Sequence, residues 1–197
     1  MAAQEKNRIF GLEALEAEAG RGRPPVEAWN PPYCGDIGLA IGANGVWQYR
    51  GSPIGRRALV KLFASVLRKD ADGRHYLVTP AEKVDVAVSD APFLAVEMEV
   101  RGQGQAQELI FRTNVDDIVT ASPAHPLRFE LEAGSGGLKP YLSVRGRLEA
   151  LLTRAIAWDL AQLAMAAAET GETGAPLGLW SGGGFFALPP AAAGSAP

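Results

Sequence analysis

Two pairs of arginines are the residues of this chain best suited to chemistry. Each pair is predicted to lie at the start of an amphipathic helix, and one pair closely follows a serine and a proline. Free N–H groups and the helix dipole favour negative charge there, and guanidinium groups bind phosphate or carboxylate through paired hydrogen bonds. The pattern therefore predicts a site for a small anionic ligand. The candidate residues are Ser52, Arg56, Arg57, Arg145 and Arg147.

The simpler explanation is that carboxylates of the chain itself compensate these arginines. A cation in the first turn of a helix opposes the helix dipole, at a cost of roughly a few tenths of a kcal/mol. Ion-pair networks within the protein commonly relieve that cost. Both explanations agree with the sequence. The carboxylates available are Asp36, Glu82, Asp85, Asp90 and Asp117.

An enzyme of undefined class is the alternative function. The one cysteine, Cys34, could act as a nucleophile with His75 or His125 as its base. The residues around it match no cysteine-hydrolase signature, and a lone cysteine is more often a small buried hydrophobic residue. The second set of groups that such an enzyme could use is Glu82, Asp85 and Asp90.

The sequence contains no recognisable motif for serine catalysis, nucleotide binding or metal binding. Ser52 directly follows Gly51, so the segment lacks the spacing of the Gly-x-Ser-x-Gly elbow, and its expected role is to cap a helix. The glycine runs do not have the spacing of a P-loop or a dinucleotide fingerprint. Two distant histidines and scattered carboxylates form no ligand cluster. We therefore assign no catalytic residue, no cofactor and no metal ion.

The first half of the chain predicts a hairpin followed by a helix. Asn44-Gly45 separates strands expected at residues 37–42 and 46–50, because both turn residues tolerate positive φ. Ser52-Pro53 then suits the N-cap and first position of a helix whose apolar face continues to Leu67. A short helix is also expected before this region, at residues 5–19.

The second half is predicted to consist of strands closed by a helix. Alternation of apolar and polar residues indicates strands at residues 74–79, 84–89, 93–101, 108–113, 118–121, 127–131 and 138–144. A long helix is expected from Arg147 to Ala168. Residues 171–197 are rich in glycine, alanine and proline and are expected to form a flexible tail.

These elements predict an α+β fold of two tandem small units, each with antiparallel strands packed on one long helix. The hairpin, arginine pair and helix of residues 37–68 recur at residues 127–160, which indicates an internal repeat with Leu59 equivalent to Leu148. The second unit has the element order of a pleckstrin-homology domain, by analogy of fold alone. The predicted divisions are residues 1–23 (helix and linker), 24–82, 83–170 and 171–197 (tail).

Composition and charge limit the class of protein. The 197 residues are 47% hydrophobic and 21% charged, which is typical of a folded protein with a real core. A net charge of −3 argues against binding to nucleic acid. The amino terminus lacks the apolar core of a signal peptide, and the most apolar predicted helix is too short to span a membrane. We expect a cytoplasmic protein.

The segment from Trp29 to Phe93 resembles a bacterial family, the domain of unknown function 1285. The shared residues are Trp29, Pro32, Cys34, Gly35, Asp36, Gly45, Trp47, Gly51, Pro53, Ile54, Arg56, Leu59, Phe63, residues 76–80, Glu82, Lys83 and residues 90–93. Arg145, Leu148 and the helix expected after them are similar to the family's second half. The resemblance covers roughly residues 26–165. It implies a two-part α+β fold with an internal repeat, a role in ligand binding or signalling, and no assigned catalytic residues.

The sequence therefore favours a non-enzymatic, regulatory or signalling protein that binds a small anionic ligand, or a protein partner, near the helix starts. The alternatives are the enzyme described above and a protein–protein interaction module. Such a module would use the aromatic side chains of the tail or an exposed sheet edge.

Overall fold

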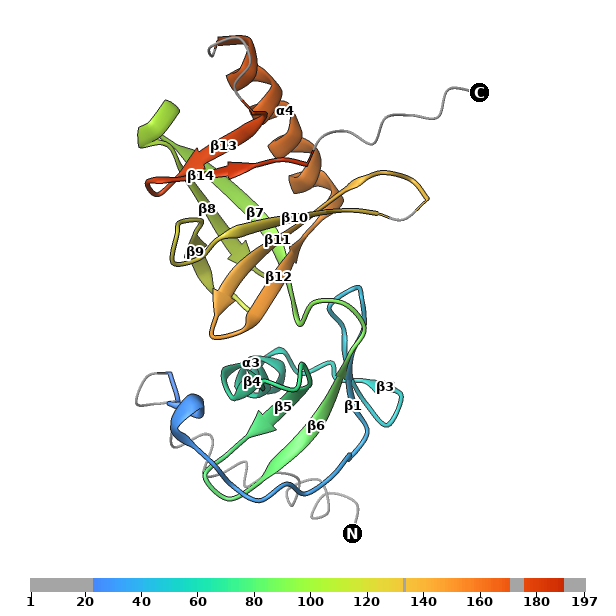
Figure 1. The fold of residues 1–197 in the computed structure, drawn as a ribbon. Coiled ribbons are helices and arrows are strands. Elements are labelled where there is room, and N and C mark those ends of the chain that lie inside the picture. Colours follow the sequence, from blue (N-terminus) through green and yellow to red (C-terminus); the bar gives the residue numbers. More distant parts are fainter. Residues whose placement is uncertain (1–22, 133, 171–175, 190–197) are drawn as a thin grey trace. The chain divides into compact units, whose positions relative to one another are not determined.

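The computed structural model of the protein describes residues 23–132, 134–170 and 176–189 (Figure 1). The chain divides into two compact units between Asp90 and Ala91. The sequence predicts this boundary at residue 82, before the strand β6 (Lys83–Val88). β6 pairs with two strands of the first unit, so the first unit includes the whole of β6. The helix predicted at residues 5–19 lies outside the described residues.

The first unit is a six-stranded sheet in the order β3-β2-β1-β6-β5-β4. The strands other than β6 are β1 (Leu39–Ile41), β2 (Trp47–Tyr49), β3 (Ser52–Pro53), β4 (Leu67–Lys69) and β5 (His75–Val78). β1 and β2 form the predicted hairpin, and Gly45 between them has a φ of 73°. The helix α3 (Arg57–Ser65) contacts the sheet through Phe63, whose ring centroid is 6.1 Å from that of the buried Trp47.

The predicted helix in this unit is wrong at both ends. Ser52 and Pro53 pair with Tyr49 and Gln48 and extend the hairpin, so neither begins the helix. The N-cap is Arg56, whose side chain makes no capping hydrogen bond. At the other end, Leu67 leaves the helix to pair with β5 and is 1% exposed. Strand pairing therefore overrides a local apolar pattern that also fits a helix.

The second unit is a six-stranded sheet in the order β10-β11-β12-β7-β8-β9, curled into a half-barrel (Figure 1). Its strands are β7 (Phe93–Arg101), β8 (Glu108–Thr113), β9 (Ile118–Thr120), β10 (Leu127–Leu131), β11 (Leu138–Arg145) and β12 (Leu148–Leu152). The helix α4 (Arg154–Thr170) contacts β7 and β11. The described residues also form two short 3-10 helices, η1 (Val26–Ala28) and η2 (Gly104–Ala106).

The helix predicted to begin at Arg147 begins at Arg154 instead. The residues between form β12, in which Leu148, Ala150 and Leu152 are buried and alternate with more exposed neighbours. This is the period of a strand and not of a helix. Because Leu59 lies in α3 and Leu148 in β12, the predicted equivalence between them is wrong.

The two sheets nevertheless share one pattern of connections. In each, the first and last strands along the chain pair in parallel at the centre, β1 with β6 and β7 with β12. Each strand of that pair belongs to a three-stranded antiparallel meander that forms one half of the sheet. The prediction of purely antiparallel strands is therefore wrong at the centre of each sheet. The helix follows the third strand in the first unit and the sixth in the second.

Part of the predicted flexible tail is folded. β13 (Gly178–Ser181) and β14 (Gly184–Ala187) form a hairpin that contacts η2, α4 and β8. Trp180 and Phe185 pack against each other with ring centroids 5.3 Å apart. Among the helices of the described residues, none combines the length and apolar character needed to cross a membrane.

Candidate functional site

One face of the first sheet is polar across three strands. The registers of β4, β5 and β6 align Arg68, Tyr76 and Asp85 in one row. The adjacent row on the opposite face, Leu67, Leu77 and Val84, is apolar and buried. Because side chains alternate along each strand, the polar row faces away from this apolar row.

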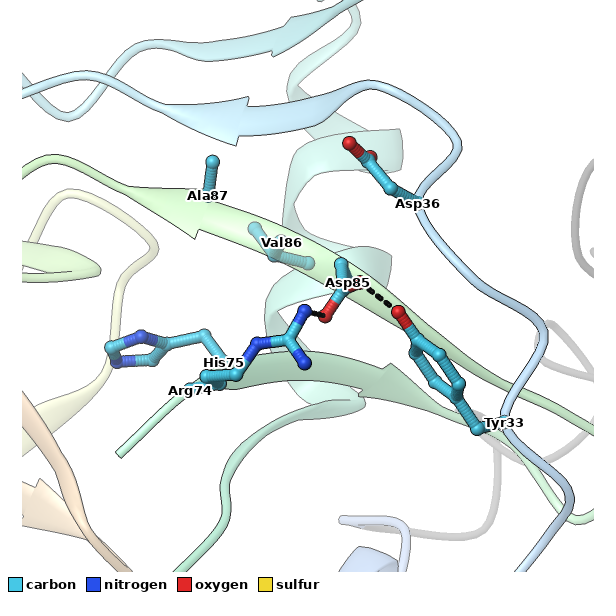
Figure 2. A pocket seen from close by; sticks show the side chains of 7 residues that line it. All are labelled: Tyr33, Asp36, Arg74, His75, Asp85, Val86 and Ala87. Atoms are coloured by element: carbon cyan, nitrogen blue, oxygen red, sulfur yellow. Dashed lines mark hydrogen bonds and ion pairs between the residues drawn. The ribbon is translucent and has the colours of Figure 1, made fainter. Parts of the chain in front are cut away.

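An open pocket of about 520 Å³ lies beside the polar row (Figure 2). It contains charged, aromatic and apolar side chains from the segment before β1, from β5 and its preceding residue, and from β6. The lining residues are Tyr33, Asp36, Arg74, His75, Asp85, Val86 and Ala87.

Asp85 is the central charged group of the pocket. Its Oδ1 accepts a hydrogen bond from Nη2 of Arg74 at 2.5 Å, and its Oδ2 accepts one from the hydroxyl of Tyr33. The Asp85 side chain is 12% exposed, whereas that of Arg74 is 56% exposed. A buried carboxylate is therefore held by two partners that are both about half exposed.

Backbone hydrogen bonds position Tyr33 over the pocket. Lys83 N–H donates to the carbonyl of Pro32 at 3.0 Å, and Cys34 N–H donates to the carbonyl of Lys83 at 2.8 Å. Asp85 N–H donates to the carbonyl of Gly35 at 3.1 Å. The segment before β1 thus runs along β6 like a short additional strand.

The Arg74 guanidinium lies beside two tyrosine rings. Its central carbon lies 6.0 Å from the ring centroid of Tyr33 and 5.4 Å from that of Tyr76. The two rings meet edge to face, 6.2 Å apart. The Tyr76 hydroxyl donates to Asp72 at 2.6 Å, and this hydrogen bond and burial raise the pKa of Tyr76 to about 12. Tyr76 is therefore a neutral donor at physiological pH.

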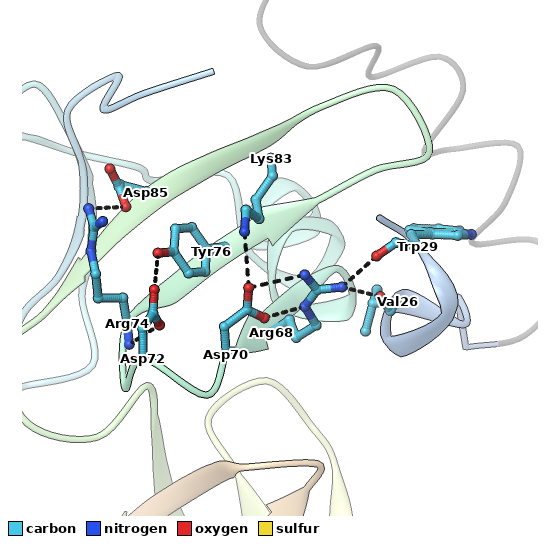
Figure 3. Close-up of polar contacts among 9 residues, drawn as sticks. All are labelled: Val26, Trp29, Arg68, Asp70, Asp72, Arg74, Tyr76, Lys83 and Asp85. Carbon is cyan, nitrogen blue, oxygen red and sulfur yellow. Dashed lines mark hydrogen bonds and ion pairs between the residues drawn. The ribbon is translucent and has the colours of Figure 1, made fainter. Parts of the chain in front are cut away.

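A second group of ion pairs adjoins the pocket and holds η1 in place (Figure 3). Arg68 donates to Asp70 from Nε at 2.5 Å and from Nη2 at 3.2 Å, and Lys83 Nζ lies 3.1 Å from the same carboxylate. Nη1 of Arg68 donates to the carbonyls of Val26 at 2.7 Å and Trp29 at 2.8 Å. These contacts tie the N-terminal segment to the polar face.

The predicted anion-site residues do not all lie at helix starts. Arg56 and Arg57 are exposed at the start of α3, and Ser52 is exposed in β3. Arg145 ends β11, and Arg147 is exposed in the turn before β12. The prediction of a helix start at the second pair is wrong because the apolar run after it forms a strand.

Arg145 has a partner within its own unit. Nη1 pairs with the carboxylate of Asp117, and the guanidinium lies 4.8 Å from the ring centroid of Phe93. The two side chains of the ion pair are 14% and 18% exposed. Asp117 is one of the carboxylates that the sequence predicts as possible partners of the arginine pairs. The contact stabilises the half-barrel and presents little of Arg145 to a ligand.

The predicted catalytic groups are not brought together as a set. Cys34 is exposed, and its Sγ lies 3.6 Å from the carbonyl oxygen of Pro32. Nδ1 of His125 contacts the carbonyl of Ser143 in the second unit. Of the three candidate carboxylates, only Asp85 lines the pocket. Within the ranges that the structure covers, no group of three or more His, Cys, Asp or Glu residues could hold a metal ion.

The sequence did not indicate Tyr33 and Arg74 as site residues. Tyr33 lies 52 residues from Asp85, and no local pattern links them. The usable sequence signal is Asp85 itself, a charged residue within the alternating pattern of its strand. Its partners follow from strand register, which the sequence alone leaves open.

His75 is the pocket residue whose protonation is most perturbed. Burial, and secondarily the positive charge of Lys69, lower the pKa of His75 to about 4. Its Nε2 is buried and has no hydrogen-bond partner in the structure. Figure 2 shows the ring directed away from Asp85. His75 is thus a neutral wall residue at physiological pH.

Lowering the pH from 7 to 5 should therefore reduce the free energy of unfolding through His75. The unfolded chain takes up a proton near pH 6.5 and the folded chain only near pH 4, so the loss develops between these values. Allowing for partial exposure and solvent screening, we expect a loss of about 1 kcal/mol. Urea unfolding at both pH values should show a smaller loss for His75→Leu than for wild type. Equal losses in wild type and His75→Leu would contradict this assignment.

Comparisons with known proteins agree on one family. The N-terminal domain of the DUF1285 family, a domain of unknown function, matches residues 24–91. Its C-terminal domain, also of unknown function, matches residues 92–188 and thus includes the β13–β14 hairpin that the sequence resemblance left out. No curated protein is significantly similar to the chain.

Two crystal structures of DUF1285 family proteins are similar to this chain. The one from Silicibacter pomeroyi DSS-3 is 43% identical, with a TM-score of 0.77, over 88% of this chain and 93% of that one. The one from Shewanella baltica OS155 is 30% identical, with a TM-score of 0.51, over 64% of this chain and 92% of that one.

Proposed function

The chain belongs to the DUF1285 family, and we propose that it is a non-enzymatic binding protein whose first unit takes a small polar ligand beside Asp85. The observation that carries this proposal is the open pocket of about 520 Å³ built on a buried carboxylate. The volume lies within the range of known small-molecule sites, and a few polar groups converge on the pocket. The family descriptions assign no function that would direct the choice of ligand.

The state of the pocket residues supports binding over catalysis. Each oxygen of Asp85 already accepts a hydrogen bond, so the carboxylate is poorly placed to act as a base. Cys34 does not line the pocket, and the ring of His75 is directed away from Asp85 (Figure 2). The pocket therefore offers recognition groups in place of an assembled nucleophile and base.

The same pocket supports a regulatory role. Tyr33 belongs to the segment that joins η1 to β1, and backbone hydrogen bonds hold that segment along β6. A ligand that contacts both Tyr33 and Asp85 would stabilise this attachment in preference to the detached state. Ligand binding would then change the population of an ordered N-terminal segment, which a partner could detect.

The start of α3 is a second candidate site, for a small anion. Its N-cap side chain makes no capping hydrogen bond, and its first turn contains no acidic residue. Arg56 and Arg57 are exposed there, and Ser52 is exposed in the preceding strand. Backbone N–H groups and guanidinium groups together suit phosphate or carboxylate.

A ligand screen by thermal unfolding tests both sites. A compound at about 100 times its Kd stabilises the folded protein by about 2.7 kcal/mol, which raises Tm by several degrees. We expect a ligand of the pocket to raise Tm in wild type and Arg56→Ala but not in Asp85→Asn. An anion bound at the start of α3 should raise Tm in wild type and Asp85→Asn but not in Arg56→Ala.

The screen should contain amines, guanidines, carboxylates, phosphates and uncharged polar compounds, and circular dichroism should confirm that each variant is folded. If no compound shifts Tm in wild type, neither site is a binding site. Shifts that persist in both variants would place the ligand elsewhere.

A further inference from the structure

We propose that the ligand of the Asp85 pocket carries a guanidinium or primary ammonium group, and that Arg74 occupies the place of this group in the unliganded protein. The inference rests on the proposed function, because it names the class of ligand for the same pocket. The arginine pairs predict an anionic ligand. The pocket is lined by other residues, and its proposed ligand has the opposite charge.

The charge of the lining favours a cation. Asp36 and Asp85 contribute two negative charges, and Arg74 contributes one positive charge. Oδ1 of Asp36 accepts a hydrogen bond from Gly38 N–H at 2.7 Å. In the part of the chain that the structure describes, no lysine or arginine pairs with Asp36. An entering anion would meet a net negative surface, whereas a cation would find an exposed carboxylate available.

The surroundings of the Arg74 guanidinium are those of a site for a cation. The group contacts the Asp85 carboxylate at 2.5 Å and lies within 6.0 Å of the ring centroids of Tyr33 and Tyr76. A carboxylate beside aromatic rings recognises guanidinium and ammonium groups through charge and cation–π attraction. The protein's own arginine therefore indicates which chemistry the pocket accepts.

Exposure distinguishes Arg74 from the structural arginine of the same face. The Arg68 side chain is 9% exposed, and its guanidinium is held by Asp70 and two backbone carbonyls (Figure 3). The Arg74 side chain is 56% exposed, and it forms an ion pair with Asp85. Arg74 can therefore turn into solvent more readily than Arg68, while the buried Asp85 and Tyr76 stay in place.

A ligand cation would then take over the hydrogen bond to Oδ1 of Asp85 and the position beside the two tyrosine rings. Asp36 would bind a second donor of the ligand from the other side of the pocket, since Asp36 and Arg74 lie on opposite sides of Asp85 in Figure 2. Because Arg74 competes for the same carboxylate, it lowers the apparent affinity of the ligand.

Titration of methylguanidine, followed by NMR or calorimetry, tests this competition. We expect Arg74→Ala to bind the probe at least tenfold more tightly than wild type, and Asp85→Asn in the Arg74→Ala background to abolish binding. Arg101→Ala is the matched control, because Arg101 is 60% exposed and paired with Glu99 in the second unit. It should leave the affinity unchanged.

Asp36→Asn provides an independent variant that should fold normally, since Asp36 is exposed and asparagine can still accept from Gly38. It should weaken the binding of methylguanidine to otherwise wild-type protein about tenfold. Unchanged affinity in both Arg74→Ala and Asp36→Asn would overturn the inference.

Binding of inorganic phosphate or acetate instead of methylguanidine, lost in Asp85→Asn, would overturn the cation inference and leave the proposed function intact. If no screened compound binds either wild type or Arg74→Ala, both the cation inference and the proposed function are wrong.

Discussion

Replacing Arg68 by methionine should lower the free energy of unfolding by about 3 kcal/mol. Methionine keeps most of the apolar stem but removes the hydrogen bonds to Asp70, Val26 and Trp29. Burial tends to raise the pKa of Asp70, but the hydrogen bonds from Arg68 and Lys83 outweigh it and hold that pKa below its usual value. Without Arg68, Asp70 keeps Lys83 as its partner in a site that is 21% exposed.

Equilibrium unfolding in urea measures this loss, and hydrogen exchange should show faster exchange of the η1 amides. The matched control is Arg101→Met, which breaks the exposed pair with Glu99 and should cost less than about 1 kcal/mol. If Arg68→Met costs no more than this control, Arg68 does not hold the N-terminal segment.

The second large effect is expected for Ser181→Ala, at about 3 kcal/mol. Ser181 is 0% exposed; its hydroxyl donates to the carbonyl of Ala121 at 2.6 Å and accepts from Leu109 N–H at 2.8 Å. Alanine would leave a buried carbonyl and a buried N–H without that partner. Both belong to residues that are 0% exposed, so water cannot easily replace the serine.

Loss of the serine hydroxyl should also loosen the attachment of the β13–β14 hairpin. Another hydrogen bond to the hairpin is donated by Nε2 of Gln107 to the carbonyl of Trp180, at 2.8 Å. Urea unfolding followed by tryptophan fluorescence measures both effects. Ser89→Ala, at an exposed position in the first unit, should change the free energy of unfolding by less than about 0.5 kcal/mol. A similarly small effect of Ser181→Ala would show that the hairpin is held by other contacts.

The strands that the sequence predicted correctly have a strong local pattern. β7 (Phe93–Arg101), β8 (Glu108–Thr113) and β10 (Leu127–Leu131) have the predicted bounds. The Asn44-Gly45 turn is also confirmed, because only a few residue types adopt its backbone conformation. The resemblance to the DUF1285 family, read from single residues and short motifs over roughly residues 26–165, is confirmed, and the family match extends further, over residues 24–188.

The errors occur where two structures compete for one apolar run. The apolar patterns that reach Leu67 and that follow Arg147 predict helices, but Leu67–Lys69 and Leu148–Leu152 form strands. Each pairs with a strand that satisfies its backbone hydrogen bonds, β5 for the first and β11 and β7 for the second. A short apolar run does not contain this information, because its period is compatible with either structure.

The sequence by itself determined the family, the two-unit organisation, the first hairpin and most strands, because each depends on residue types close together in the chain. Only the tertiary structure decided which charged groups meet. Arg145 pairs with Asp117, and Asp85 receives hydrogen bonds from Tyr33 and Arg74. The physical reason is that strand register selects partners far apart in sequence, and register is set by the packing of the whole sheet.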